Sequence, residues 1–295
     1  MTDQPTIGVV GAGLMGSGIA QVCAVAGFRT IVQDTLPAAL ERGAAGIRKS
    51  LAKFVEKGKL TPADEAAALG RLSFTGDLAG MSGCGFVIEA ITEDLALKNR
   101  VWQTLDDCTG PATIFASNTS SLSIIAMAAA TNRADRFVGL HFFNPVPLMP
   151  LVEVVRTVRT SQATVDAAFA VVRQLGKEPI VARDRSGFVV NLLLVPYILD
   201  AIRALEQGVA SIADIDTGMR LGAGHPMGPL TLADFVGLDT LARIGDIMVE
   251  EYREARYAAP PLLKRMVTAG LFGRKSGQGF YDYRRDPPTP MELGL

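Results

Sequence analysis

Histidine, cysteine and tryptophan are the scarcest side chains in this 295-residue sequence, with two, three and one copies respectively. The three cysteines (Cys23, Cys84 and Cys108) are odd in number, have no CxxC spacing and lie among small or apolar residues. This pattern favours reduced thiols over disulfides or metal ligands. We therefore expect no metal site and an intracellular protein.

An excess of one charge and a long apolar run are also missing. The 29 basic and 30 acidic side chains nearly cancel, so bulk attraction to nucleic acid or to an anionic membrane is excluded, and a small-molecule partner is favoured. Apolar stretches such as "GFVVNLLLVPYIL" are interrupted by Asn191 and Pro196 and fall short of the roughly 20 residues of a membrane span. The start of the chain has no basic segment before its apolar run, which argues against a secretory signal. We expect a cytoplasmic protein.

The first part of the chain alternates short β-branched runs with Ala-rich segments of helical spacing, which predicts a parallel sheet covered by helices. The expected strands are 6–10, 29–34, 85–91 and 113–118, and the expected helices are 15–27, 38–60 and 95–108. Two further apolar runs, 136–143 and 151–157, flank the turn-rich "NPVPLMP" and are expected to pair antiparallel. A helix over 161–176 and a strand over 178–184 follow.

A chain of this length predicts two domains. The polar and glycine-containing "RDRSG" at 183–187 marks the expected boundary, with domains 1–184 and 185–295. Beyond it, the segments 191–210, 212–222, 230–257 and 260–270 have helical spacing and little strand signal. The second domain is therefore expected to be all helical.

Gly11, Gly13 and Gly16 form a GxGxxG motif directly after the first expected strand and at the start of the first expected helix. The first glycine allows a tight turn, the second lets backbone approach a pyrophosphate, and the third lets helix and strand pack closely. The start of the helix offers N–H groups and a positive dipole end to the phosphates. We include Leu14 and Met15 of the same turn in the predicted dinucleotide site.

Asp34 ends the second expected strand, where a carboxylate can accept the ribose hydroxyls and repel a 2′-phosphate. NAD is therefore favoured over NADP. The alternative is a small-residue helix packed on the sheet beside a solvated aspartate. The motif in this context predicts an α/β protein with a Rossmann-type doubly wound sheet and a second, all-helical C-terminal domain.

His141 ends one run of the expected antiparallel pair and Glu153 lies inside the other. If the two runs fold back on each other, the carboxylate can fix the imidazole tautomer and stabilise the imidazolium that forms when the histidine takes a proton. The alternatives are a structural histidine and a glutamate that reaches solvent at an edge. His225 lies in a loop rich in glycine and proline. A capping or packing role fits this position at least as well as a catalytic role, so His225 is not assigned to chemistry.

Seven motifs occur in the order seen in 3-hydroxyacyl-CoA dehydrogenases, and the sequence resembles the short, single-function 3-hydroxybutyryl-CoA dehydrogenase form of that family. The motifs are "GAGLMGSGIAQ", "EAITEDLALKNRVW", "SNTSSLSI", "HFFNPVPLMPLVEVV", "DRSGFVVN", "HPMGPLTLADFVGLD" and "GRKSGQGFYDY". The resemblance implies reversible NAD-dependent oxidation of (S)-3-hydroxyacyl-CoA to 3-oxoacyl-CoA, a step of fatty acid β-oxidation. It also implies a homodimer formed through the helical domain.

Carried over by motif, the resemblance implies a set of site residues. They are His141 as catalytic base with Glu153 as its partner, Ser120 and Asn191 on the substrate hydroxyl and thioester carbonyl, Asn144 beside the nicotinamide, and Glu93, Lys98, Ser120 and Lys275 along the cofactor.

Several of these residues have plainer interpretations. Ser120 could cap a helix over "SLSIIAMA", and Asn191 could be an ordinary buried amide on a helix. Glu93 could be an acid in the first turn of a helix, and Lys98 a solvated lysine.

Lys49, Lys53 and Lys57 recur every four residues on one expected helix, which is typical of a solvated face. In the family the corresponding helix approaches the nucleotide end of coenzyme A, and Lys53 matches that position best. Leu192 stands where most members have arginine.

Two other functions stay open from the residues. One is a dehydrogenase of the same architecture that acts on a free hydroxy acid or sugar acid, as gulonate dehydrogenases do. The other is a non-catalytic dinucleotide-binding protein.

Overall fold

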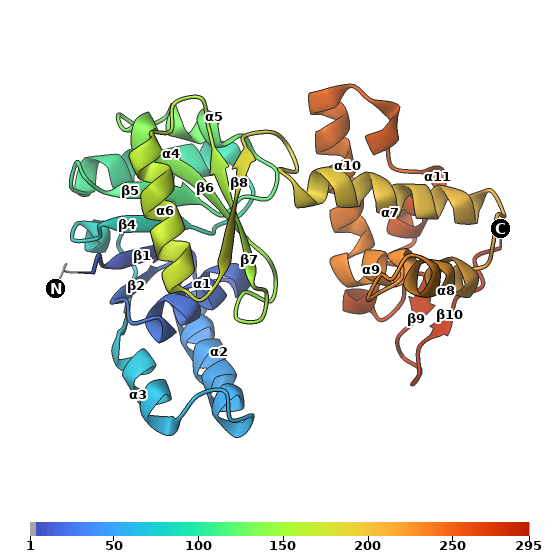
Figure 1. Ribbon diagram of the computed structural model, residues 1–295, viewed down its shortest axis with the longest axis horizontal. Coiled ribbons are helices and arrows are strands. Elements are labelled where there is room, and N and C mark those ends of the chain that lie inside the picture. The colour runs from blue at the N-terminus through green and yellow to red at the C-terminus, as the bar shows by residue number, and fades with distance from the viewer. Residues whose placement is uncertain (1–3, 295) are drawn as a thin grey trace. The chain divides into compact units, whose positions relative to one another are not determined.

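The computed structural model describes residues 4–294, and the chain divides into two compact units, Met1–Phe188 and Val189–Leu295 (Figure 1). The units adjoin in the chain at Phe188 and Val189, a few residues after the boundary expected from the sequence. Within residues 4–294, no helix combines the length and the apolar character that crossing a membrane requires.

The first unit is built on an eight-stranded sheet with the order β3-β2-β1-β4-β5-β6-β7-β8. The strands are β1 (Ile7–Val10), β2 (Thr30–Gln33), β3 (Leu72–Thr75), β4 (Phe86–Glu89), β5 (Ile114–Ser117), β6 (Phe137–Phe142), β7 (Leu151–Arg156) and β8 (Glu178–Arg183). Neighbouring strands from β3 to β6 are parallel. The order 3-2-1-4-5-6 is that of dinucleotide-binding sheets, and it confirms the predicted Rossmann-type architecture.

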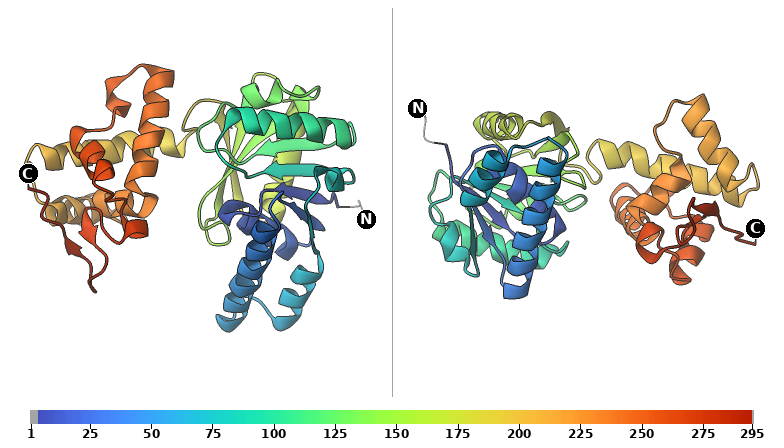
Figure 2. Two further views of the ribbon diagram at one scale, coloured as in Figure 1. Left: turned by 180° about the vertical axis from the view of Figure 1, so that it is seen from behind. Right: turned by 90° about the horizontal axis from the view of Figure 1, so that it is seen from below.

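Helices cover both faces of this sheet, because its parallel strands are apolar on both sides. The helices are α1 (Leu14–Val25), α2 (Pro37–Glu56), α3 (Pro62–Gly70), α4 (Leu95–Cys108), α5 (Ile124–Ala128) and α6 (Gln162–Gln174). One core joins residues of α1, α2, α3 and α6 to one face, and a second core joins residues of α4 and α5 to the other. Figure 1 shows α6 in front of the sheet, and the reverse view in Figure 2 brings α4 to the front.

The strands β6 and β7 pair antiparallel, as the sequence predicts. In their register His141 lies directly opposite Glu153. Side chains of directly opposed residues lie on the same face of a sheet. Strand β8 then runs parallel to β7 and completes the sheet.

The segment 61–75 contains two elements that the sequence analysis did not predict, α3 and β3. Helix α3 begins with a capping box, because Thr61 accepts a hydrogen bond from the Asp64 amide and Asp64 accepts one from the Thr61 amide. Strand β3 extends the sheet beyond β2.

The second unit is helical apart from a two-stranded ribbon. Its elements are α7 (Val190–Glu206), α8 (Ile212–Gly222), α9 (Pro229–Val236), α10 (Leu238–Tyr252), α11 (Pro261–Thr268), β9 (Tyr281–Asp282) and β10 (Thr289–Pro290). The segment 230–257, in which the sequence has helical spacing, divides into α9 and α10 at Gly237, whose φ is 97°. Leu192 packs against the apolar core of this unit.

Two buried aspartates organise the second unit. Asp216 accepts hydrogen bonds from the amides of Leu230 and Thr231, at 2.8 and 3.0 Å, and so caps α9. Asp234 accepts the amides of Phe280 and Tyr281, both at 2.9 Å, and so ties the ribbon to α9. Burial raises the pKa of the Asp234 carboxyl to about 6, although these hydrogen bonds act against it.

Candidate active site

The glycine turn connects β1 to α1, and each of its three glycines meets a different constraint. Gly11 has a φ of 101°, and a Cβ there would lie 2.7 Å from the carbonyl oxygen of Ala90. At Gly16 a Cβ would lie 1.8 Å from the carbonyl oxygen of Gly11, so only glycine allows the helix to pack here. A Cβ at Gly13 would meet nothing within 4 Å. The backbone at Gly13 is therefore open to a ligand.

Helix α1 begins at Leu14 with no side-chain cap and no acidic residue in its first turn. Its first N–H groups and positive dipole end suit an anionic group such as a pyrophosphate. Asp34, at the end of β2, accepts the amides of Ala12 and Leu36 at 2.9 and 3.0 Å. Each carboxylate oxygen has more than one lone pair, so it can still accept a ribose hydroxyl. The turn therefore fits a dinucleotide.

His141 and Glu153 form a buried pair, with Nδ1 and Oε2 2.6 Å apart. Glu153 is fully buried and His141 is 6% exposed. The carboxylate accepts the Nδ1 proton and thereby leaves Nε2 as the basic nitrogen. The rings of Phe143 and Phe188 flank the imidazole, with centroids 4.5 and 5.5 Å from it. The contact expected between His141 and Glu153 is present, and the solvent-facing interpretation of Glu153 is wrong.

A second buried charge network starts at the end of β4. The Nζ of Lys98, which is 1% exposed, lies 2.5 Å from the fully buried Glu89 and 3.2 Å from Glu93. Glu89 also accepts the hydroxyl of Ser117 at 2.7 Å. The interpretation of Lys98 as a solvated lysine is therefore wrong. Glu93 precedes the helix, which begins at Leu95, so the first-turn interpretation is also wrong.

Glu89 was not predicted as a site residue, although its sequence context carries the same signal as that of Glu153. In "GFVIEAI", as in "LVEVV", an acidic residue interrupts an apolar strand. A carboxylate buried in this way requires a partner charge or several donors, and Lys98 nine residues later supplies it.

Ser120 lies in the turn between β5 and α5, beside Glu93. Its amide donates to Glu93 Oε1 at 3.1 Å, and the hydroxyl of Thr119 donates to the same oxygen. Ser120 is not the helix cap, because α5 begins after Ser123, whose hydroxyl accepts the amide of Ala126. The capping interpretation of Ser120 is wrong, and its side chain is left for another role.

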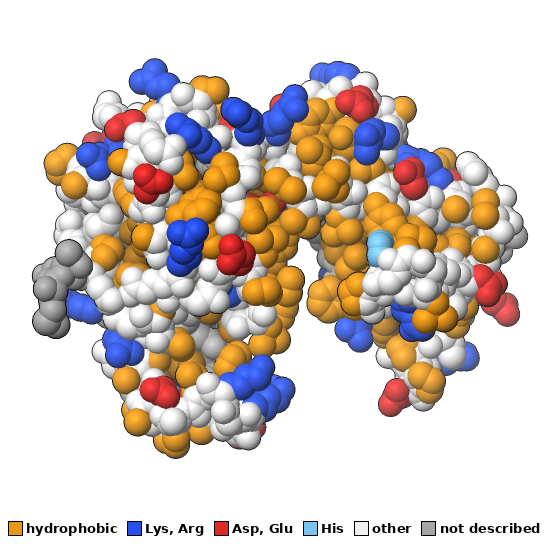
Figure 3. Space-filling view, viewed as in Figure 1, with side chains coloured by type: hydrophobic (Ala, Val, Ile, Leu, Met, Phe, Trp, Pro, Cys, Tyr) orange, Lys and Arg blue, Asp and Glu red, His pale blue; other side chains and the backbone are white. Residues whose placement is uncertain are grey.

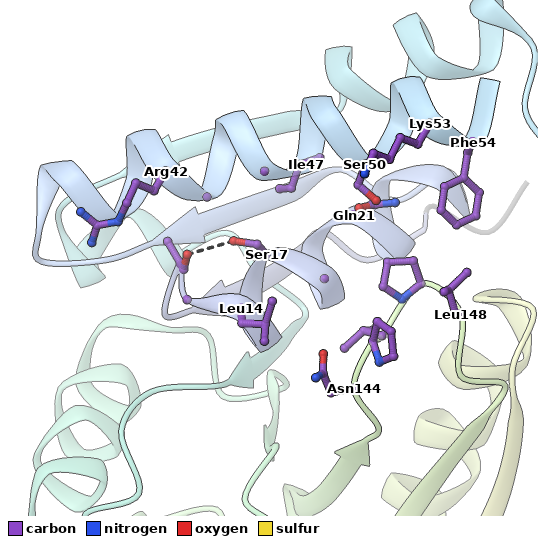
Figure 4. A pocket seen from close by; sticks show the side chains of 18 of the residues that line it. Leu14, Ser17, Gln21, Arg42, Ile47, Ser50, Lys53, Phe54, Asn144 and Leu148 are labelled. Atoms are coloured by element: carbon purple, nitrogen blue, oxygen red, sulfur yellow. Dashed lines mark hydrogen bonds between the residues drawn. The ribbon is translucent and has the colours of Figure 1, made fainter. Parts of the chain in front are cut away.

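A cavity of about 560 Å³ is lined in part by the glycine turn, at Ala12, Gly13 and Leu14. Its walls are α1, α2 and the loop after β6, and Figure 4 shows Asn144 and Leu148 of that loop opposite the side chains of the two helices. Lys53, Lys57 and Lys59 line it where α2 ends, whereas Lys49 does not. The space-filling view shows Lys and Arg side chains gathered near this end of the unit (Figure 3).

Two predicted site residues belong to the second unit. Asn191 lies in the first turn of α7 and is partly exposed. The Nζ of Lys275 lies 2.5 Å from a carboxylate oxygen of Asp239. His225, which was left unassigned, contacts the hydroxyl of Tyr197 through Nδ1 at 2.9 Å. No group of His, Cys, Asp and Glu side chains suited to a metal ion occurs in residues 4–294.

Sheets with this strand order bind dinucleotides at the carboxyl ends of their strands, where the glycine turn lies. The buried His141 and Glu153 pair suits the proton transfer that accompanies hydride transfer. These features define an oxidoreductase of the NAD-dependent dehydrogenase class.

Comparison with known proteins narrows the class. Residues 6–185 match the family model for the NAD binding domain of 3-hydroxyacyl-CoA dehydrogenase, and residues 187–283 match the model for its C-terminal domain. The chain belongs to the 3-hydroxyacyl-CoA dehydrogenase family.

The similarity to individual members extends over nearly the whole chain. A 3-hydroxybutyryl-CoA dehydrogenase of Mycobacterium tuberculosis is 51% identical over 94% of this chain and 98% of its own length. The human mitochondrial hydroxyacyl-coenzyme A dehydrogenase is 46% identical over 94% of this chain and 90% of its own. The crystal structure of an (S)-3-hydroxybutyryl-CoA dehydrogenase from Ralstonia eutropha matches with a TM-score of 0.93 and 46% identity, over 96% of this chain and 100% of that one.

Proposed function

We propose that this chain catalyses the reversible, NAD-dependent oxidation of (S)-3-hydroxyacyl-CoA to 3-oxoacyl-CoA, with 3-hydroxybutyryl-CoA as a substrate. The observation that carries the proposal is the His141 and Glu153 pair, which is buried in the same sheet as the glycine turn. The names of its relatives support the thioester substrate.

In this mechanism His141 removes the proton of the C3 hydroxyl through Nε2. Glu153 holds the imidazole in the required tautomer and stabilises the imidazolium, because it is fully buried and accepts the Nδ1 proton at 2.6 Å. When bound, NAD supplies the acceptor for the hydride. Phe143 and Phe188 limit the orientations of the imidazole ring.

The remaining site residues are assigned to binding. In the first unit, Ser120 takes the substrate hydroxyl, and Asn144, Glu93 and Lys98 belong to the cofactor site. Glu93 forms a salt bridge with Lys98 and also accepts the Ser120 amide. It thereby connects the residues assigned to the cofactor with the residue assigned to the substrate hydroxyl, which supports these assignments. In the second unit, the proposal assigns Asn191 to the thioester carbonyl and Lys275 to the cofactor.

The part of the cavity where α2 ends is assigned to the coenzyme A part of the substrate, whereas its lining by Ala12, Gly13 and Asn144 belongs to the proposed cofactor site. Three lysines where α2 ends give that part of the cavity a positive charge, which suits phosphate groups. Lys53 is the residue that we assign to direct phosphate contact. A free hydroxy acid or sugar acid would leave the lysines at the end of α2 without a counter-charge.

The proposal is tested by NADH formation from NAD and (S)-3-hydroxybutyryl-CoA, with wild type and with His141→Gln. We expect turnover by the wild type and a loss of about 10²- to 10⁴-fold in the variant, as for the removal of an acid–base group. L-gulonate is assayed in parallel. Undiminished turnover by the variant would remove His141 from its role, faster turnover of gulonate would favour the sugar-acid alternative, and NAD binding without turnover of any acyl-CoA would favour the non-catalytic one.

We further propose that the protein is a cytoplasmic homodimer that acts in fatty acid β-oxidation and associates through its helical unit. Three large apolar side chains of that unit, Leu193, Leu221 and Phe235, are 66%, 76% and 46% exposed. Apolar surface of this kind is typical of protein interfaces. Sedimentation equilibrium decides the oligomeric state.

A further inference from the structure

The loop between β6 and β7 joins the strand of the proposed base to the strand of its partner. It contains Pro145, Pro147 and Pro150, which have no N–H to donate. The amides of Leu148 and Met149 both donate to the carbonyl of Pro145, at 2.9 and 3.1 Å. Other carbonyls of the loop therefore need donors from outside it.

Lys177 supplies such donors from the turn between α6 and β8. Its Nζ lies 2.6 Å from the carbonyl oxygen of Val146 and 2.6 Å from that of Met149. The residue is only 8% exposed. Among residues 4–294, no carboxylate lies within ion-pair distance of it.

A buried ammonium without a counter-charge is unfavourable, and burial lowers the pKa of Lys177. The two carbonyls compensate part of this cost, because hydrogen bonds to charged groups are stronger than neutral ones. The unfavourable burial of the Lys177 ammonium indicates that its hydrogen bonds to the loop serve to fix the position of that loop.

The loop held by Lys177 is a wall of the 560 Å³ cavity, to which it contributes residues 144–148. The loop also packs closely against α1, since a Cβ at Gly18 would lie 2.9 Å from the Cβ of Val146. Figure 4 shows Leu148 at this wall, opposite Phe54 of α2. Release of the loop would change the width of the cavity without touching His141.

We propose that Lys177 is a positioning residue that holds the loop 144–149 as one wall of the substrate cavity, and that it thereby sets the affinity for the nucleotide-bearing part of the thioester. This inference rests on the proposed function, because it takes the nucleotide of coenzyme A as the occupant of the cavity where α2 ends. Lys177 takes no part in proton or hydride transfer.

The test compares Lys177→Met, which removes the donors at similar length, with Lys177→Arg, which keeps them. For Lys177→Met we expect the KM for 3-hydroxybutyryl-CoA to rise about tenfold, equivalent to one weakened contact of about 1.4 kcal/mol, while kcat changes by less than about threefold. Lys177→Arg is expected to restore most of the affinity. Lys49→Met, an exposed lysine of α2 outside the cavity, is the matched control and is expected to behave as wild type.

A second substrate separates positioning from general destabilisation. The 3-hydroxybutyryl thioester of pantetheine lacks the nucleotide, so its KM is expected to change much less in Lys177→Met. An equal rise for both thioesters, or no rise for the coenzyme A thioester, overturns the proposal. If the Met variant does not fold, Lys177→Gln, which keeps one shorter donor group, is measured in the same way.

Amide hydrogen exchange provides a readout independent of turnover. The amides of Leu148 and Met149 are expected to exchange faster in Lys177→Met than in wild type, while amides of β6 keep their protection. Unchanged exchange at both amides overturns the clamping role. Failure of the proposed function would instead be seen in the wild type, as absence of turnover with 3-hydroxybutyryl-CoA.

Discussion

The substitution Glu153→Gln tests the catalytic pair most directly. The carboxylate is fully buried and lies 2.6 Å from Nδ1 of His141, so water cannot replace it. A hydrogen bond to a charged group contributes about 1.5–3 kcal/mol, and each 1.36 kcal/mol in a barrier is tenfold in rate. Loss of the charge alone therefore predicts a decrease in kcat of about 10- to 150-fold.

A second effect adds to the first. The amide of glutamine can turn its NH₂ group toward Nδ1 and so favour the tautomer that carries its proton on Nε2, which cannot accept the substrate proton. The total expected loss in kcat is about 10²- to 10⁴-fold, with a smaller change in KM.

The assay is NADH formation at saturating NAD and 3-hydroxybutyryl-CoA. Glu178→Gln is the matched control, because Glu178 lies on the neighbouring strand β8 with its side chain exposed, and it is expected to keep wild-type kcat. A kcat for Glu153→Gln within about threefold of wild type would refute the reasoning, since it would mean that the carboxylate neither orients nor stabilises the imidazole.

Two further predictions concern binding and stability. Gly16→Ala is expected to destabilise the fold by about 1–3 kcal/mol, because its Cβ would lie 1.8 Å from the Gly11 carbonyl oxygen. Gly13→Ala, with open space around its Cβ, is expected to keep the stability and to lose NAD affinity. Thermal unfolding and NAD titration of both variants check this prediction, and equal destabilisation by the two substitutions would contradict it. The pKa of Asp234 is raised to about 6, against an ordinary 3.8, so the folded state holds this proton more tightly than the unfolded state. The contribution of the protonated Asp234 carboxyl to stability therefore falls as pH rises from about 4 to above 6, by at most about 3 kcal/mol. Calorimetry of the full chain at several pH values is expected to show a steeper fall across this window for wild type than for Asp234→Asn, and identical slopes would contradict the assignment.

Sequence patterns predicted the parts of the molecule whose signals are local. The glycine motif, the alternation of strands and helices, and the two apolar runs around "NPVPLMP" each occupy a short window. The pairing of His141 with Glu153 followed from a hairpin, in which nearby positions in sequence meet in space.

Other features depend on partners that leave little trace in the sequence. Lys177 binds two backbone carbonyls, and a carbonyl is present at every residue, so no pattern marks this site. Ser120 and Ser123 are equivalent as candidate caps by residue type. The start of α5 is shown by contacts in the fold, in which the Ser123 hydroxyl accepts the amide of Ala126 and Asp184 accepts the amides of Ile124 and Ile125. The segment 61–75 is different, because "TPAD" carried a capping signal that could have revealed α3.

The hairpin has a consequence for how such an enzyme could diverge. The ladder between β6 and β7 fixes His141 opposite Glu153, while the connecting loop faces the cavity. One residue inserted within either strand would turn one of the two side chains to the other side of the sheet, whereas residues added to the loop would reshape the cavity and leave the pair aligned. Length changes in the loop are thus a route to new substrates with the proton chemistry preserved.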